Sequence, residues 1–218
     1  WALLNSGGLP SLSLGQYNVP LGIFGYFLSL LGGIWLINLY NFMDGIDGLA
    51  AGEAVLVATA AGLLLLEDPV ALPLLVLSAG TFGFLILNWS PAKVFMGDAG
   101  SGFLGYAFFV FALFTEKTGT LPILSWAILL SVFVVDATMT LFKRFVERKR
   151  LSEPHRDHLY QQFIRKGYPH WAVSSTVLAV TMVNGFLTFF YRNHFLLLFI
   201  LIYCTLITAW LLVYSKQR

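Results

Sequence analysis

The sequence predicts an all-α, polytopic membrane protein with about seven transmembrane helices. Of its 218 residues, 58% are hydrophobic and only 11% are charged, whereas globular domains average about 25% charged. Apolar runs of about 20 residues, the length that a helix needs to cross a bilayer, recur along nearly the whole chain. These runs are continuous rather than alternating, which excludes a membrane β-barrel.

Seven apolar segments are expected to span the membrane, separated by polar or Gly/Pro-containing turns. They are 21–42, 50–66, 71–88, 101–114, 121–142, 172–190 and 195–214. We find no internal repeat, so residues 1–218 are predicted to form a single integral-membrane domain. The single cysteine, Cys204, excludes a disulfide framework and is predicted to face lipid or to pack between helices.

The basic residues predict the orientation of these spans. With seven spans, 11 of the 13 Lys and Arg residues fall on one side, and only Lys117 and Arg192 fall on the other. Because cytoplasmic loops carry the excess of Lys and Arg, the first side is expected to be cytoplasmic. The formal net charge of +2 is too small to indicate a nucleic-acid partner.

The first polar cluster interrupts the apolar pattern between the first two spans. Its four polar residues are spaced three apart: Asn38, Asn41, Asp44 and Asp47. On a helix this spacing places neighbours on one face, and Gly45 and Gly48 predict that the helix ends there. Carboxylates beside glycines suit a hydrated divalent cation or a polar ligand. The alternative is a polar helix end that contacts lipid headgroups.

The second polar cluster covers residues 88–102. Pro91 prevents simple continuation of the preceding helix, and a Gly-rich segment containing Asp98 begins the next one. Free N–H groups at a helix start favour an anion such as phosphate. Asp98 could hold a divalent cation that bridges to the same phosphate. The alternative is that Asp98 is only the N-cap of the helix.

The third cluster lies in the longest polar loop, 143–171. His155 and His158 are three residues apart, could share a helical face, and could ligate metal, shuttle protons or contact phosphate. Arg156 beside them favours an anion. The alternative is an amphipathic helix on the headgroups, with Lys149 and Arg150 binding anionic lipid.

Two acids lie within predicted spans. Asp136 is predicted to have a structural role, pairing with a basic residue, rather than a catalytic one, and the same preference applies to Glu53. Gly80 and Gly83 are predicted to form a helix-packing surface.

Three motifs, NLYNFMDGIDGL (38–49), FMGDAGS (95–101) and HRDHLYQ (155–161), together resemble a known family. They are similar, in this order, to the polyprenyl-phosphate N-acetylhexosamine-1-phosphate transferases of glycosyltransferase family 4. The third motif looks more like the enzymes that initiate O-antigen or capsule chains. The phospho-N-acetylmuramoyl-pentapeptide transferase of peptidoglycan synthesis has more consecutive histidines in this loop.

The resemblance implies a reaction at the bacterial inner membrane, with the active site facing the cytoplasm. A UDP-N-acetylhexosamine would donate its sugar-1-phosphate to polyprenyl (undecaprenyl) phosphate and release UMP, with Mg²⁺ or Mn²⁺ as cofactor. The product would begin a lipid-linked cell-surface glycan such as the O-antigen of lipopolysaccharide. A homodimer is compatible with this resemblance.

The resemblance also assigns roles to individual residues. Asp98 would be the metal ligand, with Asp44 close to the metal and Asp47 at the uridine end. The substrate-binding residues would be Asn38, Asn41, Asn88 and Arg156, with Asn88 on the diphosphate. His155 and His158 would contact phosphates from a mobile loop.

One feature of the family is absent from this sequence. The family carries a pair of adjacent aspartates ahead of these motifs, and here no acidic residue precedes Asp44. Since the chain begins at Trp1, we expect that the N-terminal portion of the family fold is missing and that this chain alone is inactive. The alternatives are the peptidoglycan transferase, a transporter that uses Asp136 and Glu53 as a relay, and a non-catalytic membrane scaffold.

Overall fold

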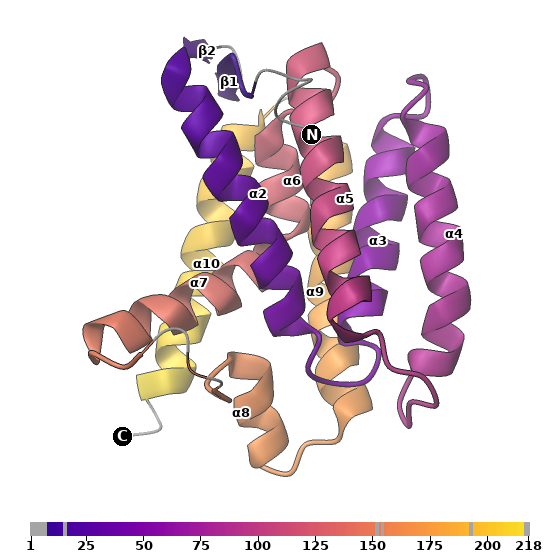
Figure 1. Ribbon diagram of the computed structural model, residues 1–218, viewed down its shortest axis with the longest axis vertical. Coiled ribbons are helices and arrows are strands. Elements are labelled where there is room, and N and C mark those ends of the chain that lie inside the picture. Colours follow the sequence, from indigo (N-terminus) through magenta and orange to yellow (C-terminus); the bar gives the residue numbers. More distant parts are fainter. Residues whose placement is uncertain (1–7, 15–16, 151–152, 154, 192–193, 216–218) are drawn as a thin grey trace.

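The computed structural model describes residues 8–14, 17–150, 153, 155–191 and 194–215, most of which are helical (Figure 1). A short hairpin of β1 (Ser11–Leu14) and β2 (Tyr17–Pro20) precedes the helices. The helices are α2 (Ile23–Met43), α3 (Leu49–Leu64), α4 (Ala71–Asn88), α5 (Gly97–Thr118), α6 (Ile123–Leu129), α7 (Ser131–Val146), α8 (Leu159–Arg165), α9 (His170–Phe190) and α10 (Phe195–Ser215).

The predicted class, an all-α polytopic membrane protein, is confirmed. Five helices are long and apolar enough to cross a membrane, namely α2, α4, α5, α9 and α10. The pair α6 and α7 makes a sixth if it counts as one bent span, and α3 is apolar but only 16 residues long. Each of the seven predicted segments is therefore largely helical, but the described part of the chain has five or six full-length spans.

The prediction of one continuous span over 121–142 is wrong. The chain bends by 80° between α6 and α7, so α7 runs across the bundle rather than along it (Figure 1). Neighbouring helices supply hydrogen bonds at the break. The Tyr203 hydroxyl donates to the Ala127 carbonyl at 2.9 Å, and Asn184 Nδ2 donates to Ser131 Oγ at 2.9 Å. These bonds satisfy polar groups that a broken helix would otherwise leave unpaired in lipid.

The β-hairpin was not expected from the sequence. Ser11 pairs with Pro20 and Leu14 with Tyr17, in antiparallel register. The carboxylate of Glu116 accepts hydrogen bonds from the backbone N–H groups of Ser13 at 2.7 Å and Ile123 at 2.6 Å. This side chain thus joins the hairpin to the start of α6.

Helices α2 and α5 approach each other closely at Gly105. A Cβ at this position would lie 2.6 Å from the Leu36 carbonyl oxygen and 2.8 Å from Ile37 Cα, so only glycine allows this spacing. Tyr40 and Phe108 fill the adjacent core, with ring centroids 5.5 Å apart. The close packing places the last turn of α2 beside the first turn of α5.

The prediction that Gly80 and Gly83 form a helix-packing surface is wrong for the described part of the chain. A Cβ at either position would meet no atom within 4 Å. Cys204 is exposed on α10, as expected for a residue that faces lipid.

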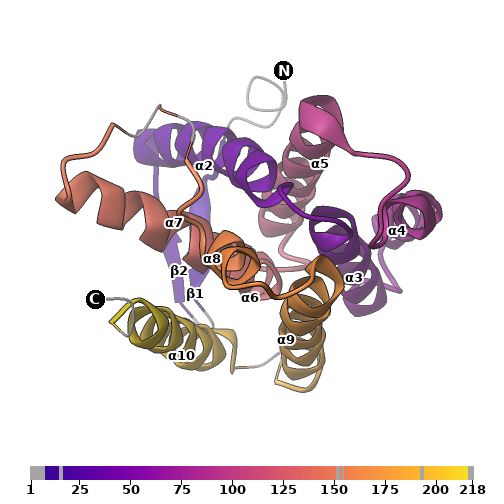
Figure 2. The same ribbon diagram turned by 90° about the horizontal axis from the view of Figure 1, so that it is seen from below.

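The three polar motifs come together at one end of the bundle. In Figure 1 the loop after α2, the loop before α5 and helix α8 all lie at the lower end, opposite the hairpin. Seen from that end, α8 lies near the centre of the arrangement, between α7 and α9 (Figure 2). Arg192, Lys216 and Arg218, which the charge distribution included, lie outside the described residues.

Candidate active site

Asn41 in the last turn of α2 connects the first two motifs. Its Nδ2 atom donates to Asp98 Oδ1 at 2.9 Å and to Ser101 Oγ at 3.2 Å, both in the first turns of α5. Asn38, one turn earlier, is exposed and donates instead to the Ile34 carbonyl of its own helix at 2.7 Å. Asn41 therefore aligns Asp98, whereas Asn38 makes no side-chain contact with that group.

Asp44 follows the end of α2 and lies near Asp98. Burial raises the pKa of Asp44 to about 6, a backbone hydrogen bond from Gly97 opposes the rise, and the Asp98 carboxylate adds to it. Among the described residues, neither carboxylate forms an ion pair with a basic side chain. The site therefore concentrates negative charge that the chain itself does not neutralise.

This donor set fits a magnesium ion. Mg²⁺ is usually bound by one or two carboxylates together with waters and substrate phosphates. Asp98, Asp44 and the Asn41 carboxamide offer oxygen ligands of this kind. The described residues contain no group of three or more His, Cys, Asp or Glu side chains that could hold a metal by themselves. Substrate or water oxygens would thus have to complete the coordination.

Asp98 is not the N-cap of α5, so that alternative is wrong. The helix begins at Gly97, four residues before the predicted start, and its N-cap, Met96, makes no side-chain capping bond. Asp98 instead lies in the first helical turn and is exposed. The Gly97 N–H at this helix start already donates to Asp44, and binding of an anion by the other N–H groups of the first turn stays a prediction.

Asp47 lies in the turn after α2, not on the helical face predicted from its spacing. Its Oδ2 atom accepts from the Ala92 N–H at 3.2 Å, and its Oδ1 atom is 3.3 Å from His170 Nδ1. Ser174 Oγ donates to the Asp47 carbonyl at 2.8 Å. Sequence reasoning missed His170. The available signal was its position directly after Pro169, at the start of a span and on the same side of the membrane as the acids.

Asn88 is buried and joins the first two motif loops. Its Oδ1 atom accepts from the Gly48 N–H at 3.1 Å, and its Nδ2 atom donates to the Val94 carbonyl at 2.9 Å. Gly48 has φ of +73°, and a Cβ there would lie 2.7 Å from the Trp89 ring. Asn88 therefore fixes the loop shape around Asp47, and contact with a diphosphate remains a prediction.

His155 and His158 do not share a helical face, because α8 begins only at Leu159. Their rings nevertheless lie 5.1 Å apart. His158 is buried against Phe42, with centroids 5.8 Å apart. Burial lowers its pKa to about 4, so its ring is neutral near pH 7. The pKa of His155 is also lowered, first by burial and then by the Arg144 charge. Arg156 is exposed.

Contacts of two residues, Arg144 and Tyr160, which sequence reasoning missed, hold this histidine segment. Arg144 forms an ion pair with Asp157, and its Nη2 atom donates to the Arg150 carbonyl at 2.7 Å. The Tyr160 hydroxyl donates to the Phe42 carbonyl at 2.8 Å, which fastens α8 to the end of α2. The segment is therefore attached to α7 on one side and to the Asp44 region on the other.

The two acids within predicted spans have structural contacts. Asp136 does not pair with a basic side chain as predicted. It accepts hydrogen bonds from the backbone of Leu159 and Tyr160 at the start of α8. Glu53 is buried between α3 and α9, where Thr181 Oγ1 donates to its Oε2 atom at 2.6 Å.

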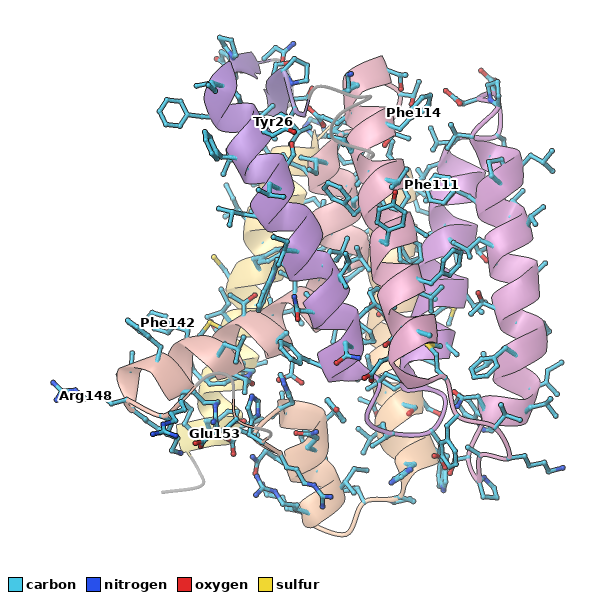
Figure 3. The ribbon with its side chains drawn as sticks, viewed as in Figure 1. Tyr26, Phe111, Phe114, Phe142, Arg148 and Glu153 are labelled. Atoms are coloured by element: carbon cyan, nitrogen blue, oxygen red, sulfur yellow. The ribbon has the colours of Figure 1, made fainter. Side chains whose placement is uncertain are left out.

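The end of α7 supports the alternative reading of the polar loop as a headgroup-binding segment. Phe142, Phe145 and Val146 are exposed on α7. Phe142 and Arg148 project away from the bundle (Figure 3). An exposed apolar face flanked by basic residues suits the membrane interface. His158, in contrast, is buried, so the lipid-facing and site-facing interpretations apply to different residues of the loop.

Comparison with known proteins identifies the family. The model of glycosyl transferase family 4 matches residues 2–116, which include the first two motifs. This chain belongs to glycosyl transferase family 4. The matched segment contains Asn41, Asp44 and Asp98, the residues that form the unneutralised acidic group.

Named relatives agree with this family. The chain is 36% identical over 155 residues to a probable undecaprenyl-phosphate N-acetylglucosaminyl 1-phosphate transferase of Bacillus subtilis, covering 69% of this chain and 43% of the relative. It is 31% identical over 164 residues to the undecaprenyl-phosphate alpha-N-acetylglucosaminyl 1-phosphate transferase of Escherichia coli K12, covering 71% and 44%. It is 32% identical over 213 residues to the phospho-N-acetylmuramoyl-pentapeptide-transferase of Chlorobaculum parvum, covering 84% and 56%. The chain spans about half the length of these relatives.

Proposed function

We propose that this family 4 protein transfers N-acetylhexosamine-1-phosphate from a UDP-sugar to undecaprenyl phosphate and releases UMP. The observation that carries the proposal is the pair of carboxylates, Asp44 and Asp98, which lies at the start of α5 and has no basic partner in the described chain. The names of the relatives from Bacillus subtilis and Escherichia coli support the two substrates' chemistry.

The acidic group would hold Mg²⁺ together with the donor diphosphate. When bound, Mg²⁺ would neutralise phosphate oxygens and the charge that develops on them during phosphoryl transfer. Asp98 and Asp44 would provide the carboxylate ligands, and Asn41 would keep Asp98 in one orientation through its 2.9 Å hydrogen bond. Positioning of this kind supplies most of the catalysis in phosphoryl transfer.

The remaining polar residues would orient the two phosphates. An oxygen of the lipid phosphate forms a bond to the phosphorus that carries the sugar, and the bond from that phosphorus to the UMP oxygen breaks. His155 and Arg156, which lie on the accessible part of the histidine segment, would contact phosphate oxygens. Asp47, fixed by Ala92 and His170, would face the uridine end.

An apolar cavity beside the acidic group supports a lipid substrate. It has a volume of about 520 Å³ and lies between α7, α8, α9 and α10, with Val135, Leu206 and Trp210 among its lining residues. Met43, the residue before Asp44, also lines it. Because Met43 adjoins Asp44 in the chain, we propose this cavity as the site for part of the lipid's hydrocarbon chain.

The location follows from the same arrangement. Bacterial relatives and apolar helices place the protein in a bacterial membrane. We propose that it is the inner membrane and that the polar end faces the cytoplasm, because 11 of 13 basic residues were assigned to that side. A homodimer remains part of this proposal.

UMP release tests the function directly. The intact gene product, purified in lipid nanodiscs, would be incubated with undecaprenyl phosphate, Mg²⁺ and UDP-N-acetylglucosamine. We expect UMP release that falls at least about 100-fold in Asp98→Asn, the size of effect seen when one preorganised electrostatic group is removed. Glu67→Gln, the same change in an exposed turn at the opposite end, is the matched control. Equal rates in wild type and Asp98→Asn would refute the assigned site.

The peptidoglycan reaction is a second candidate, favoured by the 84% coverage of this chain by the Chlorobaculum parvum relative. A panel of UDP-sugars separates the two functions. UMP release only with the UDP-N-acetylmuramoyl-pentapeptide donor would support the peptidoglycan reaction. If no donor releases UMP but substrate addition moves charge across proteoliposomes, the protein is a transporter instead.

A further inference from the structure

Asp136 connects the bent helix α7 to the histidine segment. Its side chain is buried, with the residue 5% exposed. Asp136 Oδ1 accepts from the Leu159 N–H at 2.7 Å, and Oδ2 accepts from the Tyr160 N–H at 3.3 Å. Thr140 Oγ1 donates to the same carboxylate at 3.2 Å. One carboxylate thus satisfies the first two N–H groups of α8, which have no acceptor within that helix.

The residues fixed by this contact reach the acidic group. Tyr160, whose N–H binds Asp136, donates its hydroxyl to the Phe42 carbonyl at 2.8 Å. The same hydroxyl lies so close to Gly45 that a Cβ there would overlap it. The start of α8 is therefore packed directly against the two residues that flank Met43 and Asp44.

The same contact also fixes the histidines. His158 directly precedes α8, its Nδ1 atom is 3.9 Å from Asp136 Oδ1, and its ring stacks between Phe42 and Tyr160. His155 contacts the His158 ring at a centroid distance of 5.1 Å. Movement of the start of α8 away from α7 would therefore displace both rings.

The bend between α6 and α7 explains how Asp136, an acidic residue within an apolar helix, can accept hydrogen bonds from the start of α8. Since α7 turns by 80° and runs across the polar end of the bundle (Figure 1), the Asp136 carboxylate can face the first N–H groups of α8. Its charge is met by backbone N–H groups and a hydroxyl instead of a basic side chain. This geometry differs from that of a relay residue, which needs a partner on a path through the membrane.

We propose that Asp136 is a positioning residue for phosphoryl transfer, which holds the start of α8 so that Tyr160 keeps its place beside Asp44 and His155 keeps its place against His158. The proposal rests on the proposed function. Asp136 also lines the apolar cavity proposed for the lipid, but both of its carboxylate oxygens accept hydrogen bonds from the start of α8, so the role that we assign to it acts through α8.

The test compares Asp136→Ala and Asp136→Asn with Asp68→Ala in the intact gene product in nanodiscs. Asp68 is a matched control, because its Oδ1 atom accepts from the Val70 N–H at 2.9 Å just before α4, at the opposite end of the bundle. We expect Asp136→Ala to lower kcat per folded molecule about 10- to 100-fold with little change in KM for the UDP-sugar. Asp136→Asn, which keeps one acceptor oxygen, should be intermediate, and Asp68→Ala should match wild type.

Amide hydrogen exchange gives a readout that does not depend on activity. Loss of a charge-assisted hydrogen bond should speed exchange at residues 159–162 by about tenfold or more in Asp136→Ala, without a change at residues 98–104 of α5. Unchanged exchange at 159–162, or a wild-type kcat with faster exchange there, would overturn the proposal. If Asp136→Ala does not fold, the isosteric Asp136→Asn variant decides the question by the same two measurements. A wild-type protein that releases no UMP refutes the proposed function, and exchange then still tests the attachment of α8.

Discussion

Two groups of carboxylates at the same end of the molecule are neutralised in different ways. Asp157 is paired with Arg144, and Asp136 accepts backbone N–H groups of α8. Asp44 and Asp98 lie near each other and have no basic partner in the described chain. The first group therefore stabilises the structure without any addition, whereas the second gains most from a cation that comes with the substrate.

The largest expected effect breaks the first group. Arg144 is 6% exposed, and its replacement in Arg144→Met leaves Asp157 without its partner and the Arg150 carbonyl without a donor. Removing one member of a buried ion pair costs about 3–5 kcal/mol, and the partial exposure of Asp157 favours the lower end. Thermal unfolding in nanodiscs should show a clearly lower Tm for Arg144→Met than for wild type. Asp98→Asn should not lower Tm, because it removes the repulsion between Asp98 and Asp44. A drop of equal size in both variants would remove the distinction between the groups.

Acid should release the histidine segment before it breaks the ion pair. Burial lowers the pKa of His158 to about 4. The Asp157 charge opposes this change and the Arg144 charge adds to it. Asp136 also faces the ring. Because the folded pKa lies below the ordinary 6.5, the neutral ring contributes full stability above pH 6.5. That stability is lost as pH falls toward 4, by about 3 kcal/mol at most.

Hydrogen exchange at the start of α8 between pH 6.5 and 4, corrected for intrinsic rates, measures this loss. The pKa of Asp157 is lowered: burial would raise it, but the Arg144 hydrogen bond and charge outweigh burial. Its contribution is therefore lost only below about pH 3.8. Protection that stays constant down to pH 4 would contradict the buried, neutral state of His158.

Magnesium should stabilise the protein through the second group only. An ion at about 100 times its Kd adds about 2.7 kcal/mol to the free energy of unfolding if it binds the folded state alone. We expect Mg²⁺ to raise Tm in wild type and in Glu67→Gln but not in Asp44→Asn or Asp98→Asn. A rise in Tm that survives in Asp98→Asn would place the ion elsewhere.

The smallest expected effect concerns the spacing that brings the second group together. In Gly105→Ala the new methyl group would meet the backbone of Leu36 and Ile37, so α2 and α5 must separate. Overpacking of this kind costs about 1–3 kcal/mol and should lengthen the Asn41–Asp98 contact. Gly80→Ala, where a Cβ meets no described atom, is the matched control. Tm measures the loss of stability, and the rate of UMP release measures the effect of the longer Asn41–Asp98 contact. Identical behaviour of the two variants would show that the close approach is unimportant.

The sequence predicted the helical class and the approximate place of every long helix because apolar length is a local property. It could not predict the break at Leu130, because the bonds that stabilise it come from Asn184 and Tyr203, on helices far along the chain. Gly80 and Gly105 look alike in sequence, and only the neighbouring helix shows that Gly105 is the contact.

The candidate site divides in the same way. Spacing identified Asn41 and Asp44, the Gly-rich helix start identified Asp98, and the fold brings the three together. Spacing placed His155 and His158 on one helix, which is wrong, although their rings do meet. The roles of Arg144 and His170 depend on partners 13 and 123 residues away, and no local pattern reports such contacts.

The bend between α6 and α7 bears on the route by which the proposed lipid substrate would enter and leave the site. Because α7 lies across one end of the bundle beside an apolar cavity, the proposed lipid substrate would reach the carboxylates sideways, from the leaflet in which it already resides. On the proposed function, the enlarged sugar-bearing headgroup is made and released in that same leaflet. If a glycan assembled on it is destined for the cell surface, the large polar headgroup would have to cross the bilayer in a later step.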